Sequence, residues 1–359
     1  MKSKNYSEKI LDVFKKKGFV FSEPDVLLDS NYIIQRSGEN FKKLMLTFED
    51  DSGKNMCLRP DLTVASCIKY LKENSKGTAK IYYAGQAYRR SNNRKDSIIK
   101  DQIGLEIIGS KKKSADDKEI INTILKSMNK IKIKNVSINI GDVSLFRQLI
   151  DSLSIPERWK LRLIRHFWRP KYFGDLLNRL ETNSDIDPIA IDFDKKKFSV
   201  MKKLNQNQEI AGRKISEILS RFNKKIRDPR SFAEGKKTAK IIREFLKISC
   251  PIDQIDKNLN KFYKKNNIKK NVINNLLPTK SLFKKDYKIF FSTNFGRDIE
   301  YYTGMVFEIW VSTKKNKQEI ARGGRYDDLL KSLGSKKDVS AVGAAINLNN
   351  LSKLTQWKI

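Results

Sequence analysis

GRDIEYYTGMVFE at residues 296–308, followed by ARGGRYDDLL at 321–330, is the stretch that decides the fold. Both segments join a glycine turn to charged and tyrosyl side chains, and the first leads into VFEIWV, a run typical of a β-strand. LRPDLT at 58–63 and YRRSNNRKDSIIKDQIGLE at 88–106 have the same mixed character. Each segment alone is more typical of an ordinary turn or strand than of a binding site, so only their combination indicates function.

Strand patterns surround these segments at both ends of the chain. A hairpin is predicted from KLMLTF and NMCL, which flank the Asp/Ser/Gly turn at residues 49–53. Further strands are predicted at 80–88, 102–108, 136–140, 288–292, 306–311 and 339–345, and helices at 6–18, 60–70 and 116–131. From about residue 144 to 284 apolar residues instead recur at helical spacing. The sequence therefore predicts an α+β protein with one sheet domain, 1–143 and 285–359, interrupted by a mostly helical insertion at 144–284.

Composition excludes several classes of protein. His166 is the single histidine, which excludes HExxH zinc sites; its Arg, Phe and Trp neighbours favour a structural role over Ser-His-Asp catalysis, and we expect no metal site. Cys57, Cys67 and Cys250 have no CxxC spacing and indicate reduced thiols. Because no apolar run is long enough to span a membrane and no signal-peptide pattern begins the chain, we expect a cytoplasmic protein without a membrane partner.

The strong positive charge has two readings. The chain has 74 Lys and Arg against 41 Asp and Glu, a formal net charge of +33. Such a charge fits nucleic acid or an acidic protein partner. The excess is spread over the chain as lysine runs, which favours generic surface charge over a dedicated nucleic-acid site.

In this order and spacing, the four segments resemble the histidyl-tRNA synthetase catalytic core, of the class II aminoacyl-tRNA synthetases. LRPDLT resembles that family's LRPEGT, and YYAGQAYRR with QIGLE resembles its motif 2 hairpin. GRDIEYYTGMVFE and GGRYDDLL resemble its RGLDYYxxTVFE and GGRYDGLV. Pro24 stands at the place of the motif 1 proline of the dimer interface, and the segment 339–351 at the place of motif 3. The resemblance implies the class II fold, an antiparallel sheet flanked by helices.

The resemblance also implies a pocket for free histidine. Asp61, Thr63 and Gln102 would accept from the α-ammonium group, and Glu106 with the tyrosine pair would bind the imidazole. Arg89 and Arg297 would face the carboxylate. The expected histidine-binding set is Asp61, Leu62, Thr63, Arg89, Gln102, Glu106, Arg297, Tyr301 and Tyr302.

The nucleotide half departs from the family pattern. Ser91 replaces the glutamate that contacts adenine, and Asn350 replaces the motif 3 arginine that holds the outer phosphates. A motif 2 loop arginine falls at Asp96. Adenylation requires neutralisation of the triphosphate charge, and these residues oppose it. We therefore expect no catalytic residues and no cofactor.

Within this family, a chain with these changes in its nucleotide half that stops at Ile359 resembles the regulatory subunit of ATP phosphoribosyltransferase. That enzyme acts in the first step of histidine biosynthesis. The resemblance implies a homodimer, L-histidine as effector and the short-form catalytic subunit as partner. Two alternatives stay open: an active histidyl-tRNA synthetase or aminoacylating protein, and an RNA-binding module on the same scaffold. Asn350 and Ser91 argue against the first, and the intact histidine-side residues have no purpose in the second.

Overall fold

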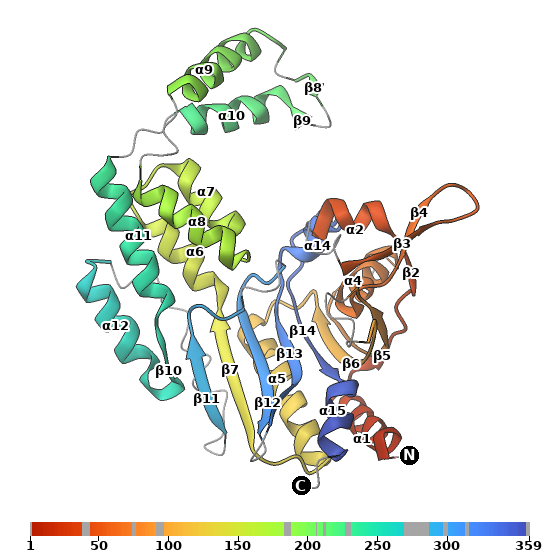
Figure 1. Cartoon of the computed structure of the whole chain (residues 1–359). Helices are drawn as coiled ribbons and strands as arrows, with labels where there is room; N and C mark the ends of the chain where they lie inside the picture. Colours follow the sequence, from red (N-terminus) through yellow and green to blue (C-terminus); the bar gives the residue numbers. More distant parts are fainter. Residues whose placement is uncertain are drawn as a thin grey trace. The chain divides into compact units, whose positions relative to one another are not determined.

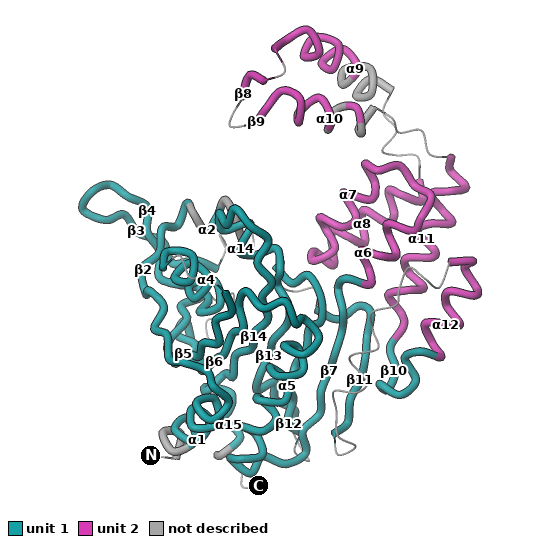
Figure 2. The backbone as a smooth tube through the Cα atoms, turned by 180° about the vertical axis from the view of Figure 1, so that it is seen from behind, with its two compact units in different colours: residues 1–144, 249–256, 274–359 teal, residues 145–248, 257–273 magenta. Residues whose placement is uncertain are grey.

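A computed structural model gives the fold of the chain. It describes residues 2–37, 44–73, 77–90, 97–182, 188–205, 207–210, 213–226, 231–268, 287–296, 301–312 and 316–356. The chain divides into two compact units (Figure 2). Unit 1 contains residues 1–144, 249–256 and 274–359, and unit 2 contains residues 145–248 and 257–273.

Unit 1 is built on a large sheet. Among the described residues nine strands pair in the order β1-β5-β6-β14-β13-β12-β7-β11-β10. Their bounds are β1 Val20–Phe21, β5 Ala79–Tyr88, β6 Ile99–Ile108, β7 Val136–Asp142, β10 Ser249–Pro251, β11 Lys288–Ser292, β12 Met305–Ser312, β13 Lys317–Arg325 and β14 Ala341–Asn347. The pairs β1–β5 and β11–β7 are parallel and the other pairs are antiparallel. The predicted α+β class with a mainly antiparallel sheet is confirmed.

Helices and a small sheet cover the large one. The helices of unit 1 are α1 Lys2–Lys16, α2 Ser30–Ser37, α4 Leu62–Lys72, α5 Lys113–Lys130, α14 Leu329–Ser332 and α15 Leu348–Gln356, with the 3-10 turn η2 Ile252–Gln254. Helix α1 packs against α5 and α15, which contact strands β6, β13 and β14 (Figure 1). The described part of the small sheet has the order β2-β4-β3, with bounds β2 Leu27–Asp29, β3 Leu46–Glu49 and β4 Asn55–Leu58. Together with α2, α4 and α14 it encloses one buried apolar cluster.

The LRPDLT segment builds the start of helix α4. Asp61 has an extended backbone and its carboxylate accepts from the Val64 amide, which is a helix N-cap. Arg59 is buried and donates to the Pro24 carbonyl at 2.5 Å and to the Gln86 carbonyl at 2.8 Å. These bonds tie α4 to strand β5 and to the segment before β2. The N-terminus of α4 is thereby fixed over the large sheet.

Unit 2 is mainly helical. Its elements are α6 Val143–Ser152, α7 Glu157–His166, α8 Pro170–Glu181, α9 Pro188–Lys202, α10 Ile215–Ile226, α11 Phe232–Leu246 and α12 Ile255–Lys265, with the short strands β8 Glu209–Ile210 and β9 Arg213–Lys214. The first residues of α6 and α12 belong to unit 1. Within the described residues, no helix combines the length and apolar character that crossing a membrane requires.

The unit boundaries differ from the predicted helical insertion at 144–284, because unit 2 ends at residue 273 and is interrupted at 249–256. Residues 249–256, which lie inside the range 144–284, belong to unit 1. Strand β10 explains this, because Ser249–Pro251 pairs with β11 and extends the large sheet by one strand. A three-residue edge strand beside a proline leaves almost no alternation to detect in the sequence.

Candidate functional site

Glu106 lies at the centre of a polar cluster inside unit 1. Its side chain projects from β6 and is fully buried. The Thr63 and Tyr83 hydroxyls donate to Oε1 at 2.8 and 3.0 Å, and the Tyr326 hydroxyl donates to Oε2 at 2.5 Å. These donors come from α4, β5 and the turn after β13, so the carboxylate joins three separate parts of the fold.

Gly343 leaves space for this carboxylate, and the bonds around Arg325 position its donor Tyr326. Gly343 of β14 is the register partner of Glu106, and a Cβ atom there would lie 1.3 Å from Glu106 Oε2. Arg325 is buried and donates to Asp117 at 2.9 Å and to Asp327 at 2.9 Å. The Tyr326 amide donates to the Ala341 carbonyl at 2.8 Å. The GGRYDD turn is therefore rigid, and it directs Tyr326 to Glu106.

Burial changes the acid–base properties of the cluster. It raises the pKa of Glu106 to about 8, although the hydrogen bonds from Tyr326, Thr63 and Tyr83 favour the ionised form. Burial and the nearby carboxylate raise the pKa of the Tyr83 and Tyr326 hydroxyls well above the usual value. A cation placed beside Glu106 would therefore favour the ionised form of this carboxyl.

Asp61 and Arg89 form an ion pair beside this cluster. Arg89 Nη2 lies 2.9 Å from Asp61 Oδ2, and Arg89 Nε donates to the Pro60 carbonyl at 2.5 Å. The other carboxylate oxygen of Asp61 caps helix α4. The predicted ammonium acceptor and the predicted carboxylate donor thus hold each other, and a histidine ligand would have to contact a carboxylate that is already paired.

Tyr301, Tyr302 and Leu62 lie near the cluster, and Gln102 lies further along strand β6. The rings of Tyr301 and Tyr302 are 5.1 Å apart, and Tyr301 lies 5.8 Å from Tyr326. Gln102 lies four residues before Glu106 on β6, so it is on the same face of the strand. Leu62 is buried and packs with Tyr83 under the cluster. Arg297, Ser91 and Asp96 lie outside the described residues.

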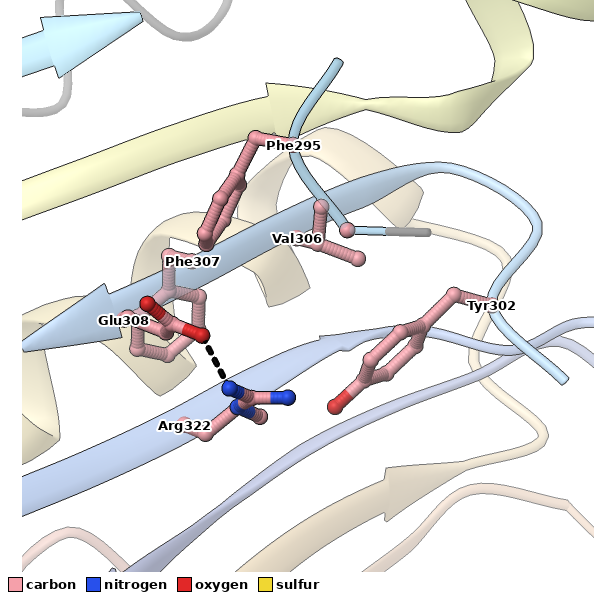
Figure 3. A pocket seen from close by; sticks show the side chains of 7 residues that line it. Phe295, Tyr302, Val306, Phe307, Glu308 and Arg322 are labelled. Carbon is pink, nitrogen blue, oxygen red and sulfur yellow. Dashed lines mark ion pairs between the residues drawn. The ribbon is translucent and has the colours of Figure 1, made fainter. Parts of the chain in front are cut away.

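A small pocket adjoins the cluster at Tyr302 (Figure 3). Phe295, Gly296, Val306 and Phe307 form its apolar wall, and Tyr302 points its hydroxyl toward Arg322, which is ion-paired with Glu308. Arg322 Nη2 also lies 3.0 Å from a Glu319 carboxylate oxygen. Next to it, the Asn350 side-chain amide donates to the Glu319 carbonyl at 2.9 Å. The position expected to hold phosphates thus has a neutral amide beside an arginine that two carboxylates neutralise.

Sequence reasoning missed Tyr83 and Tyr326 as members of the cluster. Both stand in quoted segments, YYAGQAY and GGRYDD: Tyr83 lies on strand β5 and Tyr326 lies in the turn after β13. The contacts link Glu106 to residues 23 and 220 positions away. Such pairs depend on strand order and register, which periodicity alone does not determine.

The arrangement combines hydrogen-bond donors and acceptors of both charges. It offers hydroxyls, carboxylates and an arginine in a partly buried site. Among the described residues, no group of three or more His, Cys, Asp or Glu side chains could hold a metal ion.

Comparisons with known proteins place the chain in a family. The family model described as Histidyl-tRNA synthetase matches residues 1–188 and 176–351. The chain belongs to the histidyl-tRNA synthetase family. The resemblance inferred from the four segments is confirmed.

Curated relatives within this family have another printed name. Proteins named ATP phosphoribosyltransferase regulatory subunit from Allorhizobium ampelinum and Rhizobium meliloti are 25% and 24% identical to this chain. The first match covers 97% of this chain and 96% of the relative, and the second covers 96% and 95%.

Solved structures show the same fold. A Bacillus halodurans structure described as an ATP phosphoribosyltransferase regulatory subunit/histidyl-tRNA synthetase has a TM-score of 0.61 at 18% identity, covering 98% of this chain and 78% of that one. Apo histidyl-tRNA synthetase of S. aureus has a TM-score of 0.53 at 16% identity, covering 99% and 70%. The class II synthetase fold expected from the sequence is confirmed.

Proposed function

We propose that this chain is a regulatory subunit of ATP phosphoribosyltransferase, that it senses L-histidine for feedback control of the first step of histidine biosynthesis, and that it has no catalytic activity alone. The observation that carries the proposal is the match over almost the full length of both chains to proteins with that name. The partner is then the short-form catalytic subunit.

The buried cluster supports histidine as the effector. Burial makes the negative charge of Glu106 unfavourable without a cationic neighbour. A protonated imidazole ring is such a cation. Thr63 and the tyrosine pair lie next to it. Asp61 and Arg89 offer a carboxylate and a guanidinium for the amino-acid ends of the ligand.

The neighbouring pocket supports the absence of adenylation. A nucleotide triphosphate needs unpaired positive charge at its phosphates. Here Arg322 is engaged by Glu308 and Glu319, and Asn350 supplies only a neutral amide. We expect no histidine-dependent exchange of pyrophosphate into ATP by the purified chain, and exchange above background would favour the aminoacylating alternative.

An apolar edge supports the homodimer. Strand β1 ends the large sheet next to Pro24, and Val20 and Phe21 are 68% and 52% exposed there. Val26 and Leu27, which follow Pro24, are also exposed. A terminal strand with exposed apolar side chains is suited to association. A single-species monomer in sedimentation experiments would contradict this part of the proposal.

The decisive experiment mixes the purified chain with the short-form catalytic subunit. Phosphoribosyl transfer to ATP is followed across a histidine titration, with and without this chain. Because effector coupling is typically ~1–3 kcal/mol, we expect inhibition by histidine about 5- to 150-fold stronger with the chain present. A catalytic subunit that neither co-elutes with the chain nor changes its response to histidine would refute the regulatory function.

Variants of the cluster separate sensing from assembly. Glu106→Ala and Tyr302→Ala should preserve the complex and its activity but reduce feedback. Loss of a partner for a buried ring nitrogen costs roughly 1–3 kcal/mol, so calorimetry should show histidine affinity about 5- to 150-fold lower in Glu106→Ala. Unchanged affinity would refute the pocket.

A further inference from the structure

Asp61 uses both of its carboxylate oxygens inside the protein. Oδ1 accepts from the Val64 amide at 3.0 Å and caps helix α4, and Oδ2 accepts from Arg89 Nη2 at 2.9 Å. The Asp61 side chain is only 10% exposed. A carboxylate that already holds a guanidinium has a weak attraction for a further cation, because the ion pair as a whole is neutral.

Arg89 is held along one edge of its guanidinium. Nε donates to the Pro60 carbonyl at 2.5 Å, and Nη2 donates to Asp61. The Arg89 backbone amide also donates to the Ile98 carbonyl at 2.9 Å, so its backbone is fixed as well. The outer edge, with Nη1, binds no group in the described part of the chain, and the side chain is 32% exposed. A guanidinium fixed on one edge and open on the other is prepared for the paired hydrogen bonds of a carboxylate.

The ion pair and the Glu106 cluster border the same tyrosine. Burial raises the pKa of the Tyr301 hydroxyl well above its usual value, the nearby Asp61 raises it further, and the Arg89 guanidinium lowers it. The ring centroid of Tyr301 lies 5.8 Å from that of Tyr326, whose hydroxyl donates to Glu106. A small ligand packed on Tyr301 therefore has both the guanidinium and the buried carboxyl for neighbours.

The other two residues expected to bind an ammonium group are neutral. The Thr63 hydroxyl donates its hydrogen to Glu106 at 2.8 Å, and Gln102 of β6 offers only an amide oxygen. A neutral acceptor binds an ammonium group less strongly than an unpaired carboxylate does. None of the three expected ammonium acceptors, all of which the structure describes, is therefore an unpaired anion.

We propose that Asp61 is a positioning residue for Arg89, and that the site recognises an imidazole carboxylate whether or not the ligand carries an α-amino group. This inference rests on the proposed function, in which the ligand is histidine. Arg89 binds the carboxylate through its outer edge, and Asp61 acts on the ligand only through Arg89. Direct binding of the ammonium group by Asp61 is the competing outcome of the test.

Three ligands that differ at one end test the proposal on the purified full chain. L-Histidine has both charged ends, imidazolepropionate lacks the ammonium group, and histamine lacks the carboxylate. From the usual strength of hydrogen bonds to charged groups, calorimetry should find histamine binding about 10- to 150-fold weaker than histidine. Imidazolepropionate should bind within about threefold of histidine, as expected for loss of a contact to a neutral ion pair. The reverse order of the two analogues would overturn the proposal.

Variants of Arg89 show whether this residue distinguishes the ligands. Arg89→Met should lower the ratio of histidine to histamine affinity by about tenfold or more. Arg89→Lys keeps the charge but loses the planar fork, so it should lower the ratio as well. Arg90→Met is the matched control, because it removes the same charge from the exposed next residue, and it should leave the ratio unchanged.

The positioning role of Asp61 is tested by combining variants. Asp61→Asn should lower the ratio of histidine to histamine affinity in the wild-type chain and have no further effect on it in Arg89→Met, since a positioning residue acts through its partner. Additive effects would overturn the positioning role. So would an Asp61→Asn variant that loses affinity for histidine but keeps its affinity for imidazolepropionate, because Asp61 would then bind the ammonium group directly.

Failure of this inference can be distinguished from failure of the proposed function. If histidine binds and its affinity relative to the two analogues is the same in Arg89→Met as in the wild-type chain, recognition through Arg89 is wrong and the regulatory function stands. If the wild-type chain binds none of the three ligands, the histidine sensor of the proposed function fails, and this inference fails with it.

Discussion

Glu106→Gln is the sharpest test of the buried cluster, because it removes one titration and keeps the shape. The glutamine oxygen can still accept from Thr63 and Tyr83, and its amide can donate to the Tyr326 hydroxyl in place of the present bond. The pKa of Glu106 is raised from 4.5 to about 8 in the folded protein. Between these values the folded state binds more protons than the unfolded state, so stability decreases as pH rises.

The size of the effect follows from the shift. Each pH unit inside the window is worth about 1.4 kcal/mol, and the titration curves give about 2 kcal/mol between pH 6 and pH 8. Asp142, whose pKa is raised to about 6 by burial, contributes mainly below this interval and equally in both proteins. The wild-type chain should therefore lose about 2 kcal/mol more than Glu106→Gln between pH 6 and pH 8.

Urea unfolding without histidine at the two pH values measures this difference directly. The transition midpoints of both proteins are compared at unchanged slope. Equal losses in the two proteins would refute the reasoning, since Glu106 would then titrate at its ordinary pKa and the carboxylate would not be shielded from water.

Asp61→Ala removes the N-cap of α4 and the partner of Arg89, so the free energy of unfolding should decrease by about 1–2 kcal/mol. Asp61→Asn keeps a capping oxygen and should lose less stability. Equal losses of the two variants in urea titrations would contradict the capping role of Asp61. Gly343→Ala puts a methyl group against the Glu106 carboxylate and should destabilise the fold by about 1–3 kcal/mol and weaken histidine binding, whereas Gly174→Ala, at an open helical position of α8, should do neither. Calorimetry should find histidine affinity highest between pH ~6.5, the ordinary pKa of the imidazole, and pH about 8, the pKa of Glu106, because the carboxyl and the ring then share one proton. An affinity that changes in one direction over the whole pH range would argue against contact between Glu106 and the ring.

Much of the fold was predictable from local pattern. The long strands β5, β6, β12 and β14, with their long apolar stretches, and the alternating strand β7 occur close to the expected ranges, because the apolar pattern was strong there. Strands β1 and β10 have two and three residues, and their pairing depends on the neighbouring long strand rather than on their own sequence. The division into units was obscured for the same reason at residues 249–256.

The candidate site was predictable only through the ordered motifs. Thr63, Glu106 and the tyrosine pair were named from them, and the structure brings these residues together. The structure adds what no motif contains. Asp61 is already paired with Arg89, and Gly343 gives the Glu106 carboxylate its space. These are consequences of strand register and of helix capping, so they require coordinates.

In the proposed function, the unfavourable burial of Glu106 has a use. A ligand that supplies a cation to Glu106 offsets the desolvation cost of the ionised carboxylate in the ligand-free protein. Its binding can therefore shift the conformation of the elements that hold the carboxylate. Those elements are α4 through Thr63, β5 through Tyr83 and the turn of Tyr326. The last donor stands in a turn that Arg325 connects to Asp117 of α5. Hydrogen bonds therefore connect one buried carboxylate to several elements of unit 1. Such a connection is what transmission of histidine occupancy to a partner requires.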